Sequence, residues 1–308
     1  MEQPTSTGSL DAWRVVIFTT IAGGIVYTLT DAVLQQFGHR VVGVMTTPGP
    51  PARRSADYLS VVGAVRPGVD VLVSTHPSRW AAMLAPLRPD LIICCGFPYR
   101  IPQAVVAMAR LGAINVHPSL LPRHRGPWPL NWTFRSDDAV AGMTVHRITT
   151  AFDTGPILAQ GSVPVEDEDD GDALMGKLAP LAVQLLAAAL QRVAAGDPGD
   201  PQDERLATEA PFFEDAWYRV DWSQPARTVH NQVRSWTGVS GGSHGALAEI
   251  DGELVVIART RLLPVPETSV ALAPGSLIRR DDDGMIVQCG DGPIAVVAWH
   301  PVETANPD

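Results

Sequence analysis

Lysine and cysteine are both scarce in this sequence of 308 residues. All 23 basic residues except Lys177 are arginine, and 33 acidic residues leave a net charge of −10. An acidic surface repels phosphate backbones, which disfavours general nucleic-acid binding. The odd number of cysteines, Cys94, Cys95 and Cys289, does not suit a disulfide framework, and no cluster has the spacing of a metal site. We therefore expect no metal and a reducing compartment.

Long hydrophobic runs are also lacking. The most apolar early stretch, residues 15–29, is interrupted by three threonines and by Gly23 and Gly24. It falls short of the roughly 20 residues that span a bilayer. Residues 1–13 are polar and do not have the basic-then-apolar order of a signal peptide. These features predict a cytoplasmic protein with no membrane partner.

The hydrophobic fraction of 45% is enough for a large core, and the length suggests two domains. In the first part of the chain, short β-branched runs alternate with longer amphipathic ones. This pattern predicts an α/β fold, with a mostly parallel sheet covered by helices on both faces. The expected strands are residues 15–19, 41–46, 71–75, 91–95, 113–116, 143–148 and 157–163. The expected helices are residues 25–37, 77–87, 102–110 and 173–195.

The stretch from Gly196 to Ala210 is rich in glycine, proline and aspartate and is typical of a linker. Beyond it, short alternating runs separated by Asp-Gly turns predict a small, mostly β, open-barrel-like domain. We expect it to contain strands near residues 217–222, 254–259, 275–278, 285–288 and 294–299, and a helix over 225–236. The chain thus divides into a flexible N-terminus (1–12), an α/β domain (13–196), a linker (197–212) and a C-terminal β domain (213–308).

Three polar residues could carry chemistry. Asn115 and His117 are two residues apart at the end of an expected strand, so both face the same side. The carboxyl ends of parallel strands line the crevice where ligands bind. Asp153 lies in the later turn AFDTGP. An amide donor, an imidazole and a carboxylate in one crevice suit acyl transfer to an amine. From these residues alone, a turn-capping pair and an ordinary turn aspartate remain open.

A longer motif surrounds these residues. The run INVHPSLLPRHRG, followed by GMTVHRITTAFDTGPILAQ, closely resembles the signature of folate-dependent formyltransferases. The resemblance is greatest to the branch that contains methionyl-tRNA formyltransferase and the amino-sugar formyltransferases, including the formylating domain of the bifunctional aminoarabinose-lipid enzyme. It extends over nearly the whole chain, since VDWSQPARTVHNQVRSW is similar to the opening of the family's C-terminal domain. It implies a Rossmann-like catalytic domain.

The resemblance also implies roles for the three residues. N10-formyltetrahydrofolate would supply the formyl group, and an amine on the acceptor would attack it. Asn115 would then donate to the oxyanion, and protonated His117 would assist or take the amine proton. Asp153 would orient the imidazole and favour its charged form.

The expected binding residues follow from the same resemblance. The folate is expected against Ile101, Pro102, Gln103, Ser119, Leu120, Leu121, Pro122, Thr149, Thr150, Ala151 and Phe152. The acceptor is expected against Arg125, Trp128 and Trp132. For each of these residues, packing without ligand contact is the alternative; the two tryptophans either pack a helix or supply an aromatic face for a sugar or base.

Some residues depart from the family or stay outside its motif. The segment CGFPYR, residues 95–100, stands where relatives often have a tyrosine-glycine pair or a run of aromatics. His146 is interpreted as a structural residue of its strand, with a second base as the alternative. His124 is interpreted as an exposed loop residue that could touch an anionic acceptor.

Charge favours a small amine, such as a nucleotide-linked amino sugar or a natural-product amine, as the acceptor. A tRNA acceptor would need basic residues, yet residues 205–308 hold eight arginines against fourteen acidic residues, and the loop at 47–54 adds only Arg53 and Arg54. A formyltetrahydrofolate hydrolase and an inactive folate-binding module are further alternatives. We expect a monomer or a homodimer.

Overall fold

The computed structural model of the chain describes residues 12–50, 55–238, 245–264 and 272–302. Two compact units interleave along the sequence. Unit 1 comprises Met1–His117, Val145–Ala159 and Val183–Pro201. Unit 2 comprises Pro118–Thr144, Gln160–Ala182 and Gln202–Asp308. Arg53 and Arg54 lie outside the described residues.

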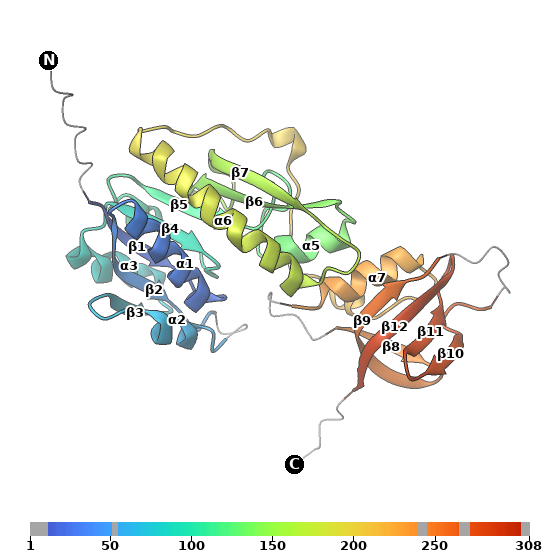
Figure 1. The fold of residues 1–308 in the computed structure, drawn as a ribbon. Helices are drawn as coiled ribbons and strands as arrows, with labels where there is room; N and C mark the ends of the chain where they lie inside the picture. Colours follow the sequence, from blue (N-terminus) through green and yellow to red (C-terminus); the bar gives the residue numbers. More distant parts are fainter. Residues whose placement is uncertain (1–11, 51–54, 239–244, 265–271, 303–308) are drawn as a thin grey trace, which may run out of the picture. The chain divides into compact units, whose positions relative to one another are not determined.

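A seven-stranded sheet is the larger of the two sheets, with the order β3-β2-β1-β4-β5-β6-β7 (Figure 1). The strands β1 to β5 pair in parallel. Their order reverses between β1 and β4, which is the point where open α/β sheets bind ligands beyond their carboxyl ends. The bounds are β1 Arg14–Phe18, β2 Arg40–Thr46, β3 Asp70–Val73, β4 Leu91–Cys95, β5 Ala113–His117, β6 Val140–Arg147 and β7 Ile157–Pro164.

Residues of β1 and β4 form the centre of the unit 1 core. Val15–Phe18 and Leu91–Ile93 are fully buried, as expected for central strands covered on both faces. Aromatic rings pack beside them, with Phe18 in edge contact with Trp80 and Phe97. The helices of this region are α1 Gly23–Gln36, α2 Tyr58–Ala64, α3 Pro77–Leu84 followed by the 3-10 turn η2 Ala85–Leu87, and α4 Gln103–Val106.

The helix α6, Gly171–Ala194, runs through parts of both units. It is long and apolar enough to cross a membrane by length and composition alone. Its leucines at 174, 178, 186 and 190 are buried, and this one-sided burial is typical of a core helix packed against a sheet.

Unit 2 contains a five-stranded antiparallel sheet with the order β10-β11-β12-β9-β8. Val229 and Val233 of α7 lie in one buried cluster with Ile257 and Val296 of this sheet. The bounds are α5 Pro129–Arg135, η3 Glu204–Leu206, η4 Asp215–Tyr218, α7 Ala226–Ser235, β8 Ala246–Ile250, β9 Glu253–Leu262, β10 Leu277–Asp281, β11 Gly284–Gln288 and β12 Pro293–Pro301. The predicted fold class, an α/β sheet followed by a small β domain, is confirmed.

Tryptophans concentrate in unit 2. Trp128 meets Phe213 and Trp236 edge to face, with ring centroids 5.2 and 5.5 Å apart. The guanidinium of Arg135 lies 4.7 Å from the ring centroid of Trp132, a cation–π distance. These rings extend the hydrophobic core of unit 2.

Two predicted elements were wrong in kind or extent. The helix expected over 102–110 is α-helical only at Gln103–Val106, after which three-residue turns such as Ala109 N–H to Val106 O lead the chain to β5. The strand expected near 217–222 begins instead as the 3-10 helix η4, followed by a single bridge between Arg219 and Leu247. The elements α2, α5 and β8 had no counterpart in the sequence-based prediction.

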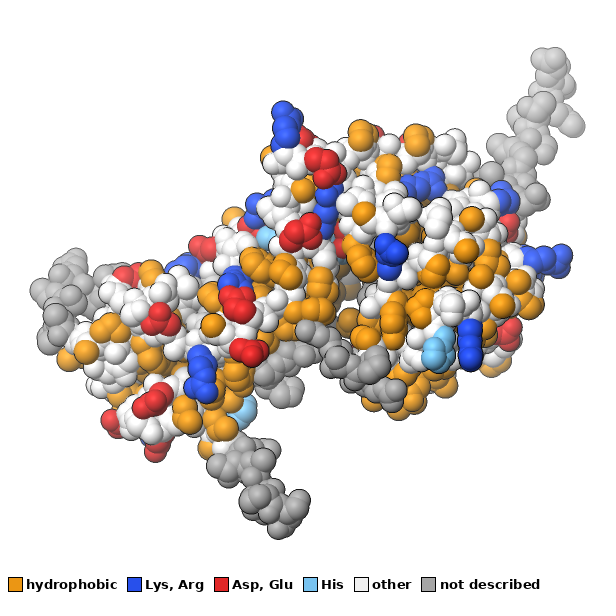
Figure 2. Space-filling model, turned by 180° about the vertical axis from the view of Figure 1, so that it is seen from behind, with side chains coloured by type: hydrophobic (Ala, Val, Ile, Leu, Met, Phe, Trp, Pro, Cys, Tyr) orange, Lys and Arg blue, Asp and Glu red, His pale blue; other side chains and the backbone are white. Residues whose placement is uncertain are grey.

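Four arginines of residues 205–308 form ion pairs with carboxylates in the described part of the chain. Arg227 pairs with Asp167 and Arg280 with Glu253. On the face drawn in Figure 2, basic side chains lie singly among acidic ones and do not gather into a patch.

Candidate active site

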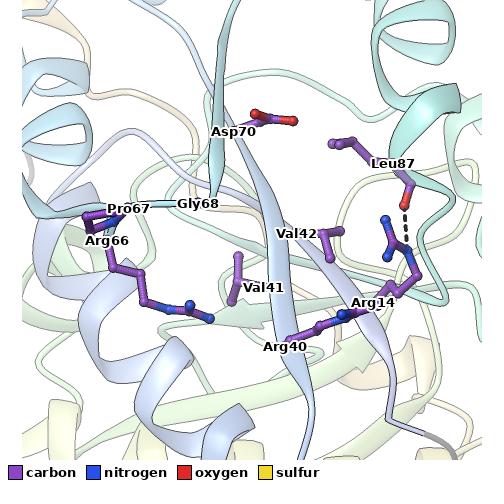
Figure 3. A pocket seen from close by; sticks show the side chains of 9 residues that line it. All are labelled: Arg14, Arg40, Val41, Val42, Arg66, Pro67, Gly68, Asp70 and Leu87. Atoms are coloured by element: carbon purple, nitrogen blue, oxygen red, sulfur yellow. Dashed lines mark hydrogen bonds between the residues drawn. The ribbon is translucent and has the colours of Figure 1, made fainter.

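A cavity of about 410 Å³ opens at the amino ends of β1, β2 and β3, where Arg14, Arg40 and Asp70 stand (Figure 3). Arg14 Nε donates to the Leu87 carbonyl at 2.9 Å, and Arg66 pairs with Asp31 at 3.0 Å. No histidine, cysteine or serine is among its lining residues. The cavity therefore offers no imidazole, thiol or hydroxyl side chain, and Asp70 is its only carboxylate.

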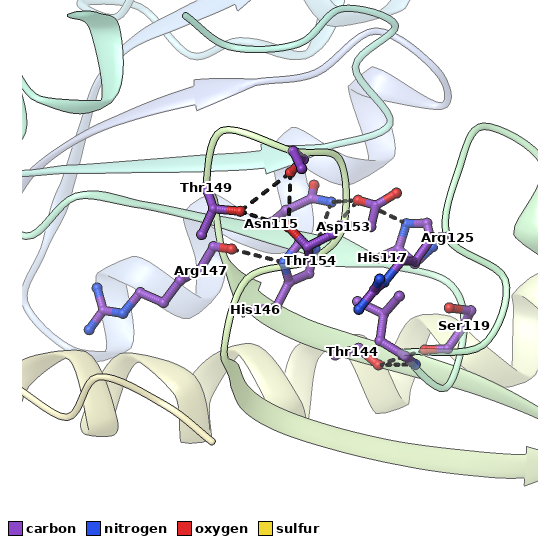
Figure 4. Close-up of polar contacts among 12 residues, drawn as sticks. Asn115, His117, Ser119, Arg125, Thr144, His146, Arg147, Thr149, Asp153 and Thr154 are labelled. Carbon is purple, nitrogen blue, oxygen red and sulfur yellow. Dashed lines mark hydrogen bonds and ion pairs between the residues drawn. The ribbon is translucent and has the colours of Figure 1, made fainter. Parts of the chain in front are cut away.

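The chemistry-bearing side chains gather at the other end of the sheet, around the carboxyl end of β5 (Figure 4). Asn115 Nδ2 lies 3.4 Å from Asp153 Oδ1 and 3.2 Å from His146 Nε2. His117 Nδ1 lies 3.7 Å from the same carboxylate oxygen, and His146 Nε2 lies 3.6 Å from it. Asn115, His117 and Asp153 lie close together in unit 1, as the sequence predicted. His146 is a fourth member of this cluster.

Strand alternation explains how these side chains meet. Asn115 and His117 are two residues apart on β5 and so project to one side. The end of β6 is fixed beside this strand because Ile148 N–H donates to the Ala113 carbonyl at 2.8 Å. Both imidazoles are nearly withdrawn from solvent, with exposed fractions of 5% for His117 and 2% for His146.

The turn that carries Asp153 is built on close backbone contact. Asp153 has φ of 55°, a left-handed conformation that aspartate tolerates better than most residues. A Cβ at Gly155 would lie 1.7 Å from the Arg147 carbonyl oxygen. The Arg147 N–H donates to the Pro156 carbonyl at 2.9 Å. Only glycine fits at position 155, which accounts for the Asp-x-Gly pattern in this turn.

The cysteines next to this cluster are not nucleophiles. Burial raises the pKa of Cys94 far above its usual value, and the neighbouring Cys95 and Asp153 raise it further. Burial alone raises the pKa of Cys95 to about 12. Both thiols stay protonated at neutral pH, so thiolate chemistry is excluded here.

Two of the three segments expected to bind folate are joined directly. Arg100 Nη1 donates to the Thr150 carbonyl at 3.1 Å, which ties the start of the segment Ile101–Gln103 to the turn Thr149–Phe152. Ile101 is buried, whereas the Phe152 ring is 59% exposed. An apolar ring left open on this turn fits a flat aromatic ligand. Arg100 was missed from sequence because nothing in its neighbourhood indicates the contact.

The third segment, Ser119–Pro122, belongs to unit 2. Thr144 organises it: its buried hydroxyl donates to the Ser119 carbonyl at 2.6 Å and accepts from the Leu121 N–H at 3.3 Å. Gln160 Nε2 donates to the same hydroxyl at 2.8 Å. Thr144 was also missed. Its place two residues before His146 on β6 indicates that both side chains lie on the same face of that strand.

The residues expected to bind the acceptor also lie in unit 2. Arg125 is buried, and its guanidinium donates to Glu204 at 2.8 Å and to Gln202 at 2.7 Å. Trp128 and Trp132 pack against the unit 2 core. These contacts agree with the packing alternative, and acceptor binding by the three residues stays a prediction.

His124 is buried and bonded to Asp138 at 2.6 Å, so its interpretation as an exposed residue was wrong.

Two family models match the sequence. Residues 14–190 match the model described as formyl transferase, and residues 214–303 match the formyl transferase C-terminal domain. The chain belongs to the formyltransferase family. The chain is 35% identical over 260 residues to a methionyl-tRNA formyltransferase of Pseudomonas paraeruginosa, and the alignment covers 82% of this chain and 81% of that one. The methionyl-tRNA formyltransferase of Citrifermentans bemidjiense is 33% identical over 265 residues, covering 84% and 80%.

Solved structures at lower sequence identity share the fold. An N-formyltransferase from Helicobacter canadensis in complex with folinic acid and dTDP-3-aminofucose matches with a TM-score of 0.67 at 14% identity, covering 94% of this chain and all of that one. HypX from Aquifex aeolicus in complex with tetrahydrofolic acid matches with a TM-score of 0.65 at 20% identity, covering 95% and 45%. At these identities the likeness concerns the fold alone.

Proposed function

We propose that this formyltransferase moves a formyl group from N10-formyltetrahydrofolate to a primary amine on a small molecule, such as a nucleotide-linked amino sugar or a natural-product amine. The observation that carries the proposal is the meeting of Asn115, His117 and Asp153 at the carboxyl end of β5. The hydrogen bond from Arg100 to the Thr150 carbonyl joins the segments that flank residues 101–103 and 149–152, which supports a folate site in unit 1.

Each side chain has a distinct task in this proposal. The acceptor nitrogen attacks the formyl carbon, and the formyl oxygen gains negative charge that the Asn115 amide N–H stabilises. His117 takes the proton that the amine loses and returns a proton to the leaving N10 nitrogen, so that the proton balance closes. Asp153 holds the imidazole in position for both transfers.

The charge distribution supports a small acceptor. Residues 205–308 carry fewer basic than acidic side chains. Arg205, Arg227 and Arg279 are each paired with an aspartate. Arg234 is buried and donates to backbone carbonyls. Few cations in this stretch are therefore left to hold an RNA backbone.

A methionyl-tRNA acceptor is the second candidate. It is favoured by the names of the two curated relatives, which align over about four fifths of both chains. Arg259 and Arg261 also lie exposed on one face of β9, without an ion pair among the described residues. These two arginines could contact the phosphate backbone of a tRNA.

Formylation of the purified protein decides between them. The acceptors are charged initiator methionyl-tRNA and a panel of nucleotide-linked amino sugars, each supplied with N10-formyltetrahydrofolate and followed by mass spectrometry. A formylated small amine is the expected result. The double variant Arg259→Gln/Arg261→Gln is the matched control: it should leave formylation of a small amine unchanged and weaken transfer to tRNA. Formyl-methionyl-tRNA as the sole product would overturn the small acceptor.

Two other activities are outcomes of the same assay. Release of formate without an acceptor would indicate a hydrolase, and binding of the donor without turnover would indicate an inactive module. The cytoplasm stays the expected compartment, since the three cysteines are free thiols. A monomer or homodimer stays the expected assembly.

A further inference from the structure

His146 is a buried imidazole with a partner at each ring nitrogen. Its Nδ1 lies 2.9 Å from the Arg147 carbonyl oxygen, and its Nε2 lies 3.2 Å from Asn115 Nδ2 and 3.6 Å from Asp153 Oδ1. The side chain is 2% exposed. Sequence reasoning assigned it a structural role in β6, and the proposed reaction makes no use of it.

The Arg147 carbonyl fixes the proton of this imidazole. A carbonyl oxygen only accepts, so the Nδ1 atom that bonds to it carries the hydrogen. The neutral ring then has a lone pair at Nε2. The carbonyl itself is held in place, because Gly155 packs against its oxygen and the Arg147 N–H is bonded to Pro156.

The lone pair at His146 Nε2 in turn fixes the Asn115 amide. Nδ2 is the donor atom of that amide, and it lies near both Nε2 and the Asp153 carboxylate. The flipped amide would set its oxygen against a lone pair and an anion, which is repulsive. The neighbours therefore select the orientation in which both amide hydrogens point toward His146 and Asp153.

We propose that His146 is a positioning residue for formyl transfer, holding one N–H of Asn115 so that the other is directed at the oxygen on which charge develops. The inference rests on the proposed function. The bond to His146 is the shorter of the two, at 3.2 Å against 3.4 Å to Asp153. With one amide hydrogen held by His146, the hydrogen on the Asp153 side is the one that the formyl oxygen shares as it becomes an oxyanion.

This role differs from that of a second base. In the Nδ1–H tautomer the only ring hydrogen is bonded to the Arg147 carbonyl, and Nε2 lies against Asn115 and Asp153, both of them protein groups. Neither nitrogen exchanges a proton with a substrate in this arrangement. His146 acts on the reaction through Asn115 alone.

Two substitutions separate positioning from packing. His146→Leu fills the space without an acceptor, whereas His146→Gln keeps an oxygen that can accept the Asn115 N–H. We expect His146→Leu to lower kcat by about 10- to 100-fold with KM for the folate donor within about threefold. His146→Gln should recover most of that loss. Equal losses in both variants, or full kcat in His146→Leu, would overturn the proposal.

His39→Leu is the matched control. His39 is also a buried imidazole of unit 1, stacked on Trp13 with ring centroids 4.0 Å apart, and it lies outside the site. The control variant should keep kcat. If it lost kcat as His146→Leu does, general loosening of unit 1 would explain both, and the proposal would fail.

An NMR measurement tests the proposal without any turnover. In uniformly 15N-labelled protein, His146 should show the Nδ1–H tautomer, and the Asn115 side-chain amide signals should shift in His146→Gln but not in His39→Leu. An Nε2–H tautomer would refute the positioning role even in an active enzyme. Absence of formyl transfer by the unaltered protein would instead refute the proposed function, with the tautomer still reporting on His146.

Discussion

The two ends of the parallel sheet in unit 1 differ: one end has an open cavity, and the other has the candidate active site. At the amino ends of β1–β3, three arginines surround about 410 Å³ of open space, and two of them are engaged with Leu87 and Asp31. At the carboxyl end of β5, four polar side chains are drawn together in a small buried cluster. Convergence of groups with complementary chemistry, more than empty volume, marks where a reaction takes place.

The largest expected effect comes from the cluster itself. Asn115→Ala removes the proposed oxyanion donor and His117→Ala removes the proposed proton carrier. Each should lower kcat/KM for formyl transfer by about 10²–10⁴-fold while leaving donor binding largely intact. Steady-state kinetics and a folate-binding titration measure both quantities. Unchanged turnover in either variant would contradict the assignment of the reaction to the carboxyl end of β5.

The turn at Gly155 should give the next largest effect. Gly155→Ala forces a Cβ against the Arg147 carbonyl, and we expect the free energy of unfolding to fall by about 1–3 kcal/mol together with activity. Gly176→Ala is the matched control, because nothing lies within 4 Å of its added Cβ in α6. That helical substitution should stabilise the protein by about 0.5–1 kcal/mol and keep activity. Chemical denaturation of both variants checks the pair.

The amino end should respond to pH through Asp90. Burial raises the pKa of Asp90, but bonds from the Arg14 N–H and the Arg110 guanidinium outweigh it and hold the pKa below its usual value. A lowered folded-state pKa stabilises the protein above pH ~4, and this contribution is lost as the pH falls further. Asp90→Asn should therefore cost about 1 kcal/mol at neutral pH. The difference from the unaltered protein should shrink in acid, as urea unfolding at several pH values would reveal.

The smallest effect is expected at Arg40, which lines the cavity and is exposed. Arg40→Ala should change the free energy of unfolding by less than about 0.5 kcal/mol and leave kcat/KM for formyl transfer unaltered. A clear loss of activity in this variant would show that the amino end takes part in function after all.

Sequence patterns predicted the central part of the fold well. β4 lies where the run Leu91–Cys95 placed it, and β5 ends one residue beyond the expected Val116. Such buried strands read as continuous apolar runs. The short helix α5 was missed because it is only seven residues long and begins with a proline. The 3-10 helix at Asp215–Tyr218 was taken for a strand because its two aromatics also suit β structure.

The sequence predicted which side chains come together at the candidate site, but it did not predict their contacts with backbone atoms. The motif pointed to Asn115, His117 and Asp153, which the fold brings together. The partner of His146 could not be predicted, because it depends on a carbonyl oxygen held by a turn eight residues further along. Sequence carries side-chain identity, whereas tautomers and amide orientation follow from backbone atoms in three dimensions.

The uneven placement of tryptophan has a practical consequence for unfolding experiments. Of the eight tryptophans, only Trp13 and Trp80 belong to unit 1. Intrinsic fluorescence during a melt will consequently report mainly on unit 2, whereas catalysis by the proposed residues Asn115 and His117 would report on unit 1. Coincident curves from the two probes would indicate one cooperative transition. If activity disappears at a lower temperature than the change in emission, unit 1 is the first part of the enzyme to unfold.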